Sequence, residues 1–227
     1  MTLNARKIKS GGPAPQPVEP GSYPARLVQV IDMGLQPQVY LGEKKDPKNE
    51  IMVTYELLDE FMKDEEGNDI DDKPRWISET FSLNSLNVDR AKSTQRYMAF
   101  DPELTFDGDW SKLLEVPVIV TLVNKASKKD KDKVYTNVAA VSTMRSKDAS
   151  RARALVNDSK FFDLENPNLD TFLTLPEWVQ TKIKGNLDFD GSALDKALNN
   201  HSGGSKKEAK KPAPQETEDD ADVEENW

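Results

Sequence analysis

A run of lysines between two apolar segments is the first feature of the chain with binding chemistry. Residues 124–133 read NKASKKDKDK and contain five lysines against two aspartates: Lys125, Lys128, Lys129, Lys131 and Lys133. Ammonium groups at this density suit a phosphate backbone, because each can replace a counterion of a nucleic acid. A lysine-rich hairpin tip is also common as a merely solvated loop, so its place in the fold decides between the two interpretations.

A second group of basic residues lies elsewhere in the chain. Residues 35–50, which we expect to be a loop, contain Lys44, Lys45 and Lys48, although neighbouring acids offset their charge. Further candidates for phosphate contacts are Arg75, Arg90, Lys92 and Arg96. Lys92 and Arg96 are four residues apart, so on a helix they would be neighbours on one face.

Aromatic side chains could complement these cations, because an unstacked base gains about 1–3 kcal/mol by stacking on an aromatic ring. Trp76 is the best candidate, since it alternates with Ser78 and Thr80 on the polar face of its segment. Packing in the core is an equally good interpretation of Trp76. Two tyrosines lie in or next to the lysine segments: Tyr40 and Tyr135. Two other tryptophans are expected to pack in the interior: Trp110 and Trp178.

Catalytic chemistry finds little support in the sequence. The one histidine, His201, lies in a Gly/Ser-rich segment, there is no cysteine, and no glycine-rich phosphate loop is present. The acids of residues 59–72 (DEFMKDEEGNDIDD) do not follow the calcium-loop pattern. We interpret them as a solvated hairpin turning at Gly67 and Asn68, which should point away from any nucleic-acid surface. We therefore expect no enzymatic activity, no cofactor and no metal site.

The charge of the chain is concentrated at its end. The 227 residues contain 31 Lys and Arg against 40 Asp and Glu, a net charge of −9, and residues 216–227 (ETEDDADVEENW) supply seven of the acids and no base. Without them 31 basic residues face 33 acidic ones. The segment could be a solubilising tail or a nucleic-acid mimic, and Trp227 favours the second, since solvation gains nothing from a large apolar side chain. The expected partner-binding residues are Asp219, Asp220, Asp222, Glu224, Glu225 and Trp227.

Five β-rich segments must position these candidates: 23–33, 51–58, 76–83, 116–123 and 134–141. Residues 85–100 between the third and fourth segments indicate a helix, and residues 109–115 a short helical turn. Three strands, a helix and two strands predict a mainly β fold: a five-stranded OB-fold barrel spanning residues 23–145, with a helix between strands three and four. In that fold the segments 35–50 and 124–133 are loops flanking the face that receives oligonucleotides.

The rest of the chain divides into three further regions. Residues 1–22 indicate a flexible basic and Pro-rich arm, with order expected from near Tyr23. Residues 146–200 indicate a helical extension, with helical patterns at 147–162, at 176–185 (PEWVQTKIKG) and at 193–200. Residues 201–227 indicate a disordered linker and the acidic tail. No apolar run could span a bilayer and no secretory signal is present, so we expect a soluble cytoplasmic protein.

Several segments resemble bacteriophage single-stranded DNA-binding proteins: GSYPARLVQV, IMVTYELLD, WISETFSLN, LLEVPVIVTLVNK, VYTNVAAV and the ending DDADVEENW. The resemblance covers residues 21–145 and 216–227. It implies an OB domain that binds exposed single strands during phage DNA replication, recombination and repair in the host cytoplasm. It also implies that the tail contacts replication proteins such as DNA polymerase and helicase–primase.

Two functions from different classes therefore follow from the sequence. The first is a non-catalytic, sequence-tolerant single-stranded DNA-binding protein whose acidic tail competes with DNA and recruits replication proteins. The alternative is an OB-like protein-interaction module, or a DNA-mimic inhibitor, whose tail binds another nucleic-acid enzyme. A homodimer, and RNA in place of DNA, stay open at this stage.

Overall fold

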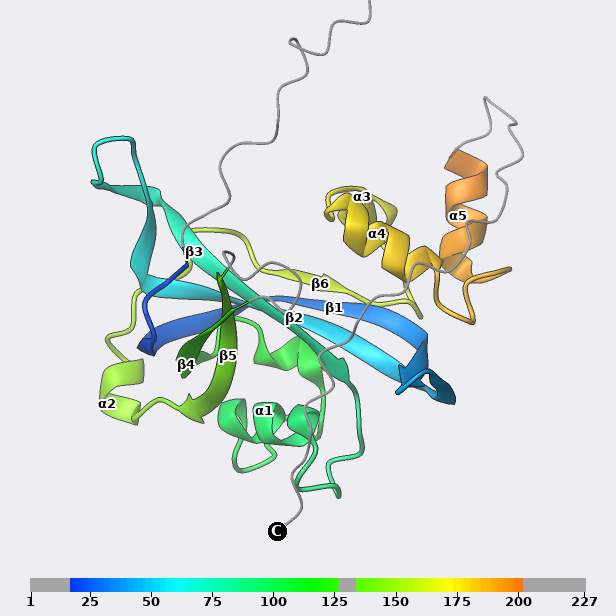
Figure 1. The fold of residues 1–227 in the computed structure, drawn as a ribbon, viewed down its shortest axis with the longest axis horizontal. Helices are drawn as coiled ribbons and strands as arrows, with labels where there is room; N and C mark the ends of the chain where they lie inside the picture. Colours follow the sequence, from blue (N-terminus) through cyan, green and yellow to red (C-terminus); the bar gives the residue numbers. More distant parts are fainter. Residues whose placement is uncertain (1–16, 127–133, 202–227) are drawn as a thin grey trace, which may run out of the picture.

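A computed structural model of the chain describes residues 17–126 and 134–201. It is mainly β, as predicted, and its centre is an antiparallel sheet in the order β3-β2-β1-β4-β5 (Figure 1). The strands are β1 (Gly21–Tyr40), β2 (Glu43–Lys63), β3 (Asp69–Ser82), β4 (Pro117–Ala126) and β5 (Val134–Thr143). A short sixth strand, β6 (Lys160–Phe162), pairs with β1 in parallel. The sheet is open, with β3 and β5 as the two ends of its main path.

Short helices complete the fold: α1 (Lys92–Phe100), η2 (Trp110–Leu113), α2 (Ser146–Ala149), α3 (Leu169–Leu173), α4 (Glu177–Lys184) and α5 (Ala193–His201). The helix α1 and the 3₁₀ turn η2 lie on one side of the sheet, and α3, α4 and α5 lie on the other (Figure 1). No helix among the described residues is long and apolar enough to cross a membrane.

The first hydrophobic core lies between the curved sheet and α1. Alternate residues of β2, among them Val53, Tyr55 and Leu57, point into it, as their period-two pattern predicts. The ring of Tyr55 stacks on Phe100 with centroids 6.2 Å apart. Trp110 is buried in the same core, which confirms its predicted packing.

The second hydrophobic core lies on the outer face of β1 and β2. Ile31, Met33 and Met52 of these strands are covered by apolar side chains from β6 and the three C-terminal helices: Phe162, Phe172, Leu175, Val179, Ile183 and Leu194. Both faces of β2 are consequently buried over residues 50–58. The extension is thus an integral part of the sheet's packing, and one of its segments is a strand.

Residues 35–50 are not the loop that the sequence indicates. They continue β1 and β2 as a two-stranded β1–β2 arm, with Gln36 opposite Lys48 and Tyr40 opposite Glu43. The strands are joined by the two-residue turn Leu41–Gly42, in which both φ angles are positive, 50° and 81°. The polar composition and two prolines made these residues look like a loop in the sequence. Pro37 and Pro47 lie at an irregularity of the strand register, where a β-ladder tolerates proline.

Two predicted helices are shorter than their patterns suggest. The helix expected over residues 85–100 begins only at Lys92, and the residues before it form turns, in which Val88 N–H donates to the Ser85 carbonyl. The helical pattern at 147–162 yields only α2. The carbonyls that follow, those of Ala152 and Arg153, accept hydrogen bonds from Arg26 of β1, and these tertiary bonds hold the chain outside a helix. The helix expected at 176–185 is confirmed as α4.

Order begins earlier than Tyr23. Val18 is buried in the first core, its N–H donates to Thr136 Oγ1 at 3.0 Å, and its carbonyl accepts from Asn124 Nδ2 at 3.0 Å. The arm predicted at 1–22 therefore ends in a segment that packs on β4 and β5. Residues 1–16, the lysine segment from 127 to 133 and the acidic tail lie outside the described residues.

Candidate nucleic-acid interface

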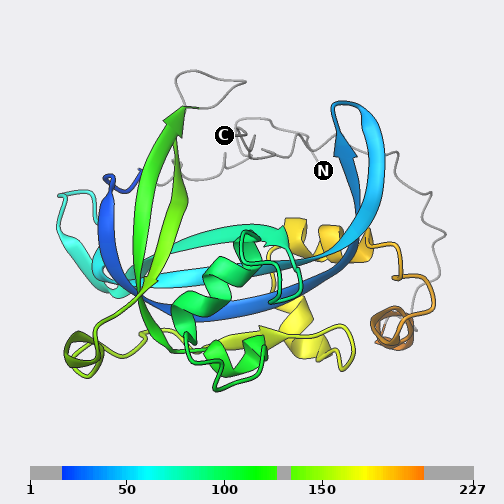
Figure 2. The ribbon, with the colours of Figure 1, turned by 90° about the horizontal axis from the view of Figure 1, so that it is seen from below.

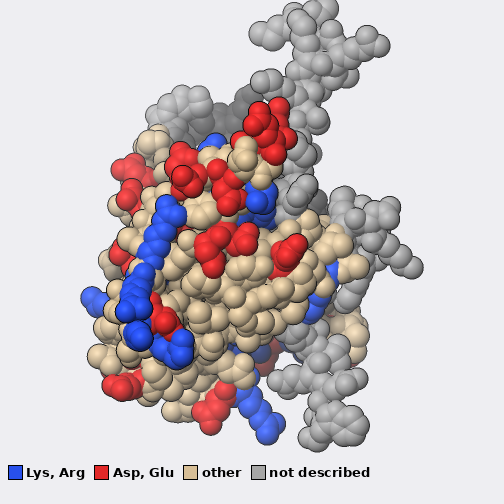
Figure 3. All heavy atoms as spheres, turned by 90° about the vertical axis from the view of Figure 1, so that its left-hand side faces the viewer, with Lys and Arg blue, Asp and Glu red and all other residues tan. Residues whose placement is uncertain are grey.

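Two β-hairpins rise on the same side of the molecule, one on the left and one on the right of the view in Figure 2. One is the β1–β2 arm, residues 35–50. The other is the β4–β5 arm, formed by residues 122–126 and 134–138. The acidic hairpin between β2 and β3 lies at the opposite end of β2 from the β1–β2 arm and beyond the β4–β5 arm. Acidic side chains gather on the upper part of the face that carries this hairpin (Figure 3). The acidic hairpin thus lies outside the space between the two arms.

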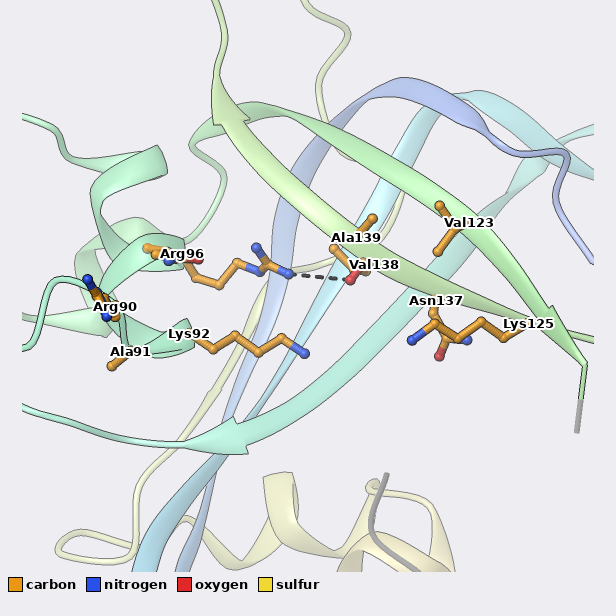
Figure 4. A pocket seen from close by; sticks show the side chains of 10 residues that line it. Arg90, Ala91, Lys92, Arg96, Val123, Lys125, Asn137, Val138 and Ala139 are labelled. Atoms are coloured by element: carbon orange, nitrogen blue, oxygen red, sulfur yellow. Dashed lines mark hydrogen bonds between the residues drawn. The ribbon is translucent and has the colours of Figure 1, made fainter. Parts of the chain in front are cut away.

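A surface pocket of about 490 Å³ lies between the beginning of α1 and the β4–β5 arm (Figure 4). Its lining residues are Arg90, Ala91, Lys92, Gln95, Arg96, Val123, Lys125, Asn137, Val138 and Ala139. Four of these ten residues are basic and none is acidic, which is unusual for a chain with a net charge of −9. The fold thus brings together Arg90, Lys92, Arg96 and Lys125, all of which the sequence singled out.

The N-terminus of α1 opens onto this pocket. The N-cap position is Ala91, no side chain caps the helix, and its first turn contains no acid. The first N–H groups of a helix lack intrahelical acceptors and carry the positive end of the helix dipole, so they attract anions. Ala91 and Lys92 line the pocket together with the exposed Arg90. This end of the pocket therefore combines two side-chain cations with a helix terminus, an arrangement suited to a phosphate.

The opposite wall offers an aromatic ring beside a cation. In the register of the β4–β5 arm Lys125 faces Tyr135, and Val123 faces Asn137, so these four side chains share one face of the hairpin. Three of them line the pocket, and Tyr135 extends the same face toward the end of the arm with 56% of its surface exposed. A cation next to an exposed aromatic ring is the pair that an unstacked nucleotide needs.

Arg96 has a role that the sequence did not indicate. Its guanidinium is buried and donates to Glu79 of β3 through Nε at 2.7 Å and Nη2 at 3.2 Å. Nη2 also donates to the Val138 carbonyl of β5 at 3.4 Å, the dashed line in Figure 4. Arg96 therefore links α1, β3 and β5 where the sheet is open. We correct its predicted role: it positions the pocket walls and is not a surface phosphate contact.

The Glu79 carboxylate interacts with Tyr55 and Lys92 in addition to Arg96. Tyr55 donates its hydroxyl to Glu79 at 2.7 Å, and Lys92 Nζ lies 3.2 Å from the same carboxylate. Burial raises the pKa of the Tyr55 hydroxyl well above its usual value, and the charge of Glu79 raises it further, so Tyr55 stays a neutral donor. Lys92 keeps 38% of its side-chain surface exposed and can reach the pocket as well as Glu79.

Trp76 does not belong to this pocket. It lies opposite Glu56 on the face of β3 turned away from the first core, whereas Glu79 lies on the core side. The indole Nε1 donates to Glu56 at 3.0 Å, and the buried Glu56 also accepts from the backbone of Val156 and from Asn157. Trp76 thus stabilises the junction with the extension, with 39% of its surface exposed. Arg75 precedes it in the same strand and does not line the pocket either.

The remaining predicted residues lie on the β1–β2 arm or outside the residues that the structure describes. Tyr40, Lys44, Lys45 and Lys48 are all exposed on the arm, and Lys45 pairs with Glu43 at 2.9 Å. Four lysines of the other loop are not described: Lys128, Lys129, Lys131 and Lys133. The same holds for the predicted tail residues Asp219, Asp220, Asp222, Glu224, Glu225 and Trp227.

The exposure of Trp178 and two amide side chains of the pocket were not predicted from the sequence. Trp178 was expected to pack, but it is 58% exposed, because Val179 and Ile183 form the buried face of α4 and Trp178 points elsewhere. Gln95 and Asn137 add amide groups to the pocket. The sequence does not reveal the uncapped helix start at Ala91, because the helical pattern extends back to residue 85.

No known family model matches the chain, and no curated protein sequence matches it. Function is therefore inferred from the geometry of the pocket and the two arms.

Proposed function

We propose that the protein is a non-catalytic, sequence-tolerant single-stranded DNA-binding protein, and that the strand runs through the pocket between α1 and the β4–β5 arm. The observation that carries this proposal is the lining of the pocket: three accessible cations, Arg90, Lys92 and Lys125, and no acid, with Tyr135 on the same face as Lys125. Phosphates would bind at the start of α1, beside Arg90 and Lys92. A base would stack on Tyr135.

The strand order supports the proposal. An OB-fold has the order β3-β2-β1-β4-β5 with a helix between β3 and β4, which is the arrangement found here apart from the open edge between β3 and β5. We therefore interpret the sheet as an opened OB barrel, with Arg96 bridging the two edge strands. OB-folds commonly bind oligonucleotides, so this interpretation favours a nucleic acid as the ligand.

The C-terminal extension favours a path of the DNA strand through the pocket, because it covers part of the face that OB-folds usually use. Oligonucleotides usually cross the outer face of strands two and three. Here the side chains of Met52, Thr54 and Glu56 on that face of β2 are buried. The pocket, in contrast, opens onto the surface beside the β4–β5 arm.

The acidic tail completes the proposed function. Residues 216–227 carry seven acids and could occupy the cations of the pocket when DNA is absent. When DNA displaces the tail, Trp227 becomes available to replication proteins, such as the DNA polymerase and helicase–primase that the resemblance to phage proteins implies. The cellular role would then be DNA replication, recombination and repair.

The test is fluorescence anisotropy with labelled oligo-dT and with a duplex of the same length, using the full chain and a chain lacking residues 216–227. We expect oligo-dT to bind more tightly than the duplex and the truncation to tighten binding at low salt. If neither chain binds oligo-dT, the proposal is wrong. Equal affinity of the two chains at low salt would refute the competing tail alone.

One observation favours the alternative, a protein-interaction module or DNA-mimic inhibitor. Trp178 is an exposed indole on the extension, and exposed aromatic rings are enriched at protein interfaces. This alternative predicts that the truncated chain binds no oligonucleotide, so the same titration separates the two functions.

A further inference from the structure

The end of the β1–β2 arm exposes three consecutive apolar side chains. Val39, Tyr40 and Leu41 form the tip, and 86% of the Leu41 surface is accessible to solvent. The first hydrophobic core and the second are formed by other residues, so the tip contributes to neither. Core packing therefore does not account for three large apolar side chains on a protruding hairpin.

Leucine is also an unfavourable residue type for the backbone conformation at position 41. It is the first residue of a two-residue hairpin turn and has a φ of 50°, in the left-handed region where Asn, Asp and Gly are preferred. Neither stability nor solubility explains a leucine at this position. Residues retained in such conformations cluster at functional sites.

The arm is held at its base by contacts with the extension. Glu50 at its base is buried, forms an ion pair with Lys182 of α4 at 2.7 Å and accepts from Gln38 at 2.7 Å. Gln36 donates to the Lys182 carbonyl at 3.2 Å. The arm is thus braced against the extension, and a braced hairpin can transmit force to whatever its tip enters.

The arm also carries cations along its length. Lys44, Lys45 and Lys48 are exposed, and the exposed acids among them are Glu43 and Asp46, of which Glu43 pairs with Lys45. Lys44 and Lys48, both on the β2 strand of the arm, can therefore contact phosphates next to the tip. The arm rises on the same side of the molecule as the pocket wall formed by the β4–β5 arm (Figure 2).

We propose that this tip is a wedge for nucleic-acid duplexes: Leu41 inserts between adjacent bases at the end of a duplex, and Tyr40 stacks on the base that is displaced. Apolar side chains inserted at base steps unstack them in this way. The proposal rests on the proposed function, since the single strand held in the pocket would bring the duplex end to the arm. The protein would then open the junction between single-stranded and double-stranded DNA.

The test compares Leu41→Asn with a matched control in the full chain. Asparagine tolerates a positive φ, so Leu41→Asn should not lower the unfolding temperature. The control is Leu104→Asn, which changes another exposed leucine with a positive φ, 53°, in the turn that follows α1, far along the chain from the arm. The probe is a duplex with an oligo-dT overhang and 2-aminopurine in the base pair next to the junction.

We expect the wild-type chain and Leu104→Asn to raise the 2-aminopurine fluorescence equally. Leu41→Asn should reduce this opening about fivefold or more, which corresponds to one lost stacking contact, while its affinity for oligo-dT without a duplex changes less than about twofold. Full opening by Leu41→Asn would overturn the wedge. So would the finding that Leu41→Asn converts a dimer into a monomer without affecting opening, since the tip would then bind a second copy of the chain. Absence of oligo-dT binding by the wild type would instead refute the proposed function.

Discussion

Arg96 of α1 and Glu79 of β3 form a buried ion pair with two hydrogen bonds, at 2.7 Å and 3.2 Å, and the same guanidinium donates to the Val138 carbonyl of β5. The two-point geometry fixes the orientation of the guanidinium plane. Since α1 and β5 form opposite walls of the basic pocket, this pair determines the spacing between them. The pocket is therefore built on a side-chain bridge at the place where the sheet lacks a backbone ladder.

Removal of the charge of Glu79 should destabilise the protein strongly. Glu79→Gln leaves the buried Arg96 guanidinium without its counterion, and breaking a buried pair in this way costs about 3–5 kcal/mol. Urea unfolding gives the free energy directly. Glu43→Gln, which breaks the exposed pair with Lys45, is the control and should cost less than about 1 kcal/mol. Similar losses for the two variants would show that Arg96 does not depend on Glu79.

Tyr135 and Trp76 should behave in opposite ways. Tyr135→Ala removes the proposed stacking platform and should weaken oligo-dT binding by about 1–3 kcal/mol, whereas Tyr135→Phe should retain most of the affinity. Trp76→Phe loses the hydrogen bond to Glu56 and should lower stability by about 1 kcal/mol with little effect on binding. Paired titrations and unfolding curves measure both quantities. A larger binding loss at Trp76 than at Tyr135 would move the strand to the outer face of β3.

Asp32 should make stability depend on pH in a specific direction. Burial raises the pKa of this carboxyl, against the opposing effect of the backbone N–H groups of Gly34 and Leu164. A raised folded-state pKa contributes stability that is complete below the unfolded-state pKa and is lost as pH rises through the folded-state value. The free energy of unfolding of the wild type, measured relative to that of Asp32→Asn, should therefore fall as pH rises through the acidic range.

Asp64 provides the comparison of opposite sign. Backbone hydrogen bonds, first that of Asn68, lower its pKa in the turn between β2 and β3. The stability of the wild type relative to Asp64→Asn should therefore rise with pH and then level off. Urea unfolding at pH values from about 3 to about 7 measures both differences. Slopes of the same sign would contradict the assignment for one of the two carboxyls.

Much of the fold follows from periodicity in the sequence. The alternation of Ile51, Val53, Tyr55 and Leu57 correctly predicts the buried face of β2, because one side of a strand must face a core. Pro176 and Gly185 correctly bracket α4, because each residue suits only its own end of a helix. These signals are local, and the structure agrees with them.

Other features depend on contacts between distant residues and could not be predicted. Arg26 of β1 binds the carbonyls that would otherwise continue α2, so helical spacing at 147–162 was misleading. Glu79 removes Arg96 from the surface, and nothing near Arg96 in the sequence reveals this partner. The β1–β2 arm was hidden because Leu41 occupies a turn position where Asn, Asp or Gly would have signalled a hairpin.

The salt dependence of oligo-dT binding decides whether the pocket holds the DNA. The variant to compare with the wild-type chain has Arg90, Lys92 and Lys125 all replaced by Ala. Each lost phosphate contact reduces the slope of log K against log salt by about 0.7 for a single strand, so the slope should become shallower by about two. The control replaces three basic residues of α2 and its flanks by Ala: Arg145, Lys147 and Arg151. We expect the control to retain the wild-type slope. An unchanged slope for the pocket variant, or an equal reduction for the control, would contradict the assignment of the pocket as the DNA-binding site.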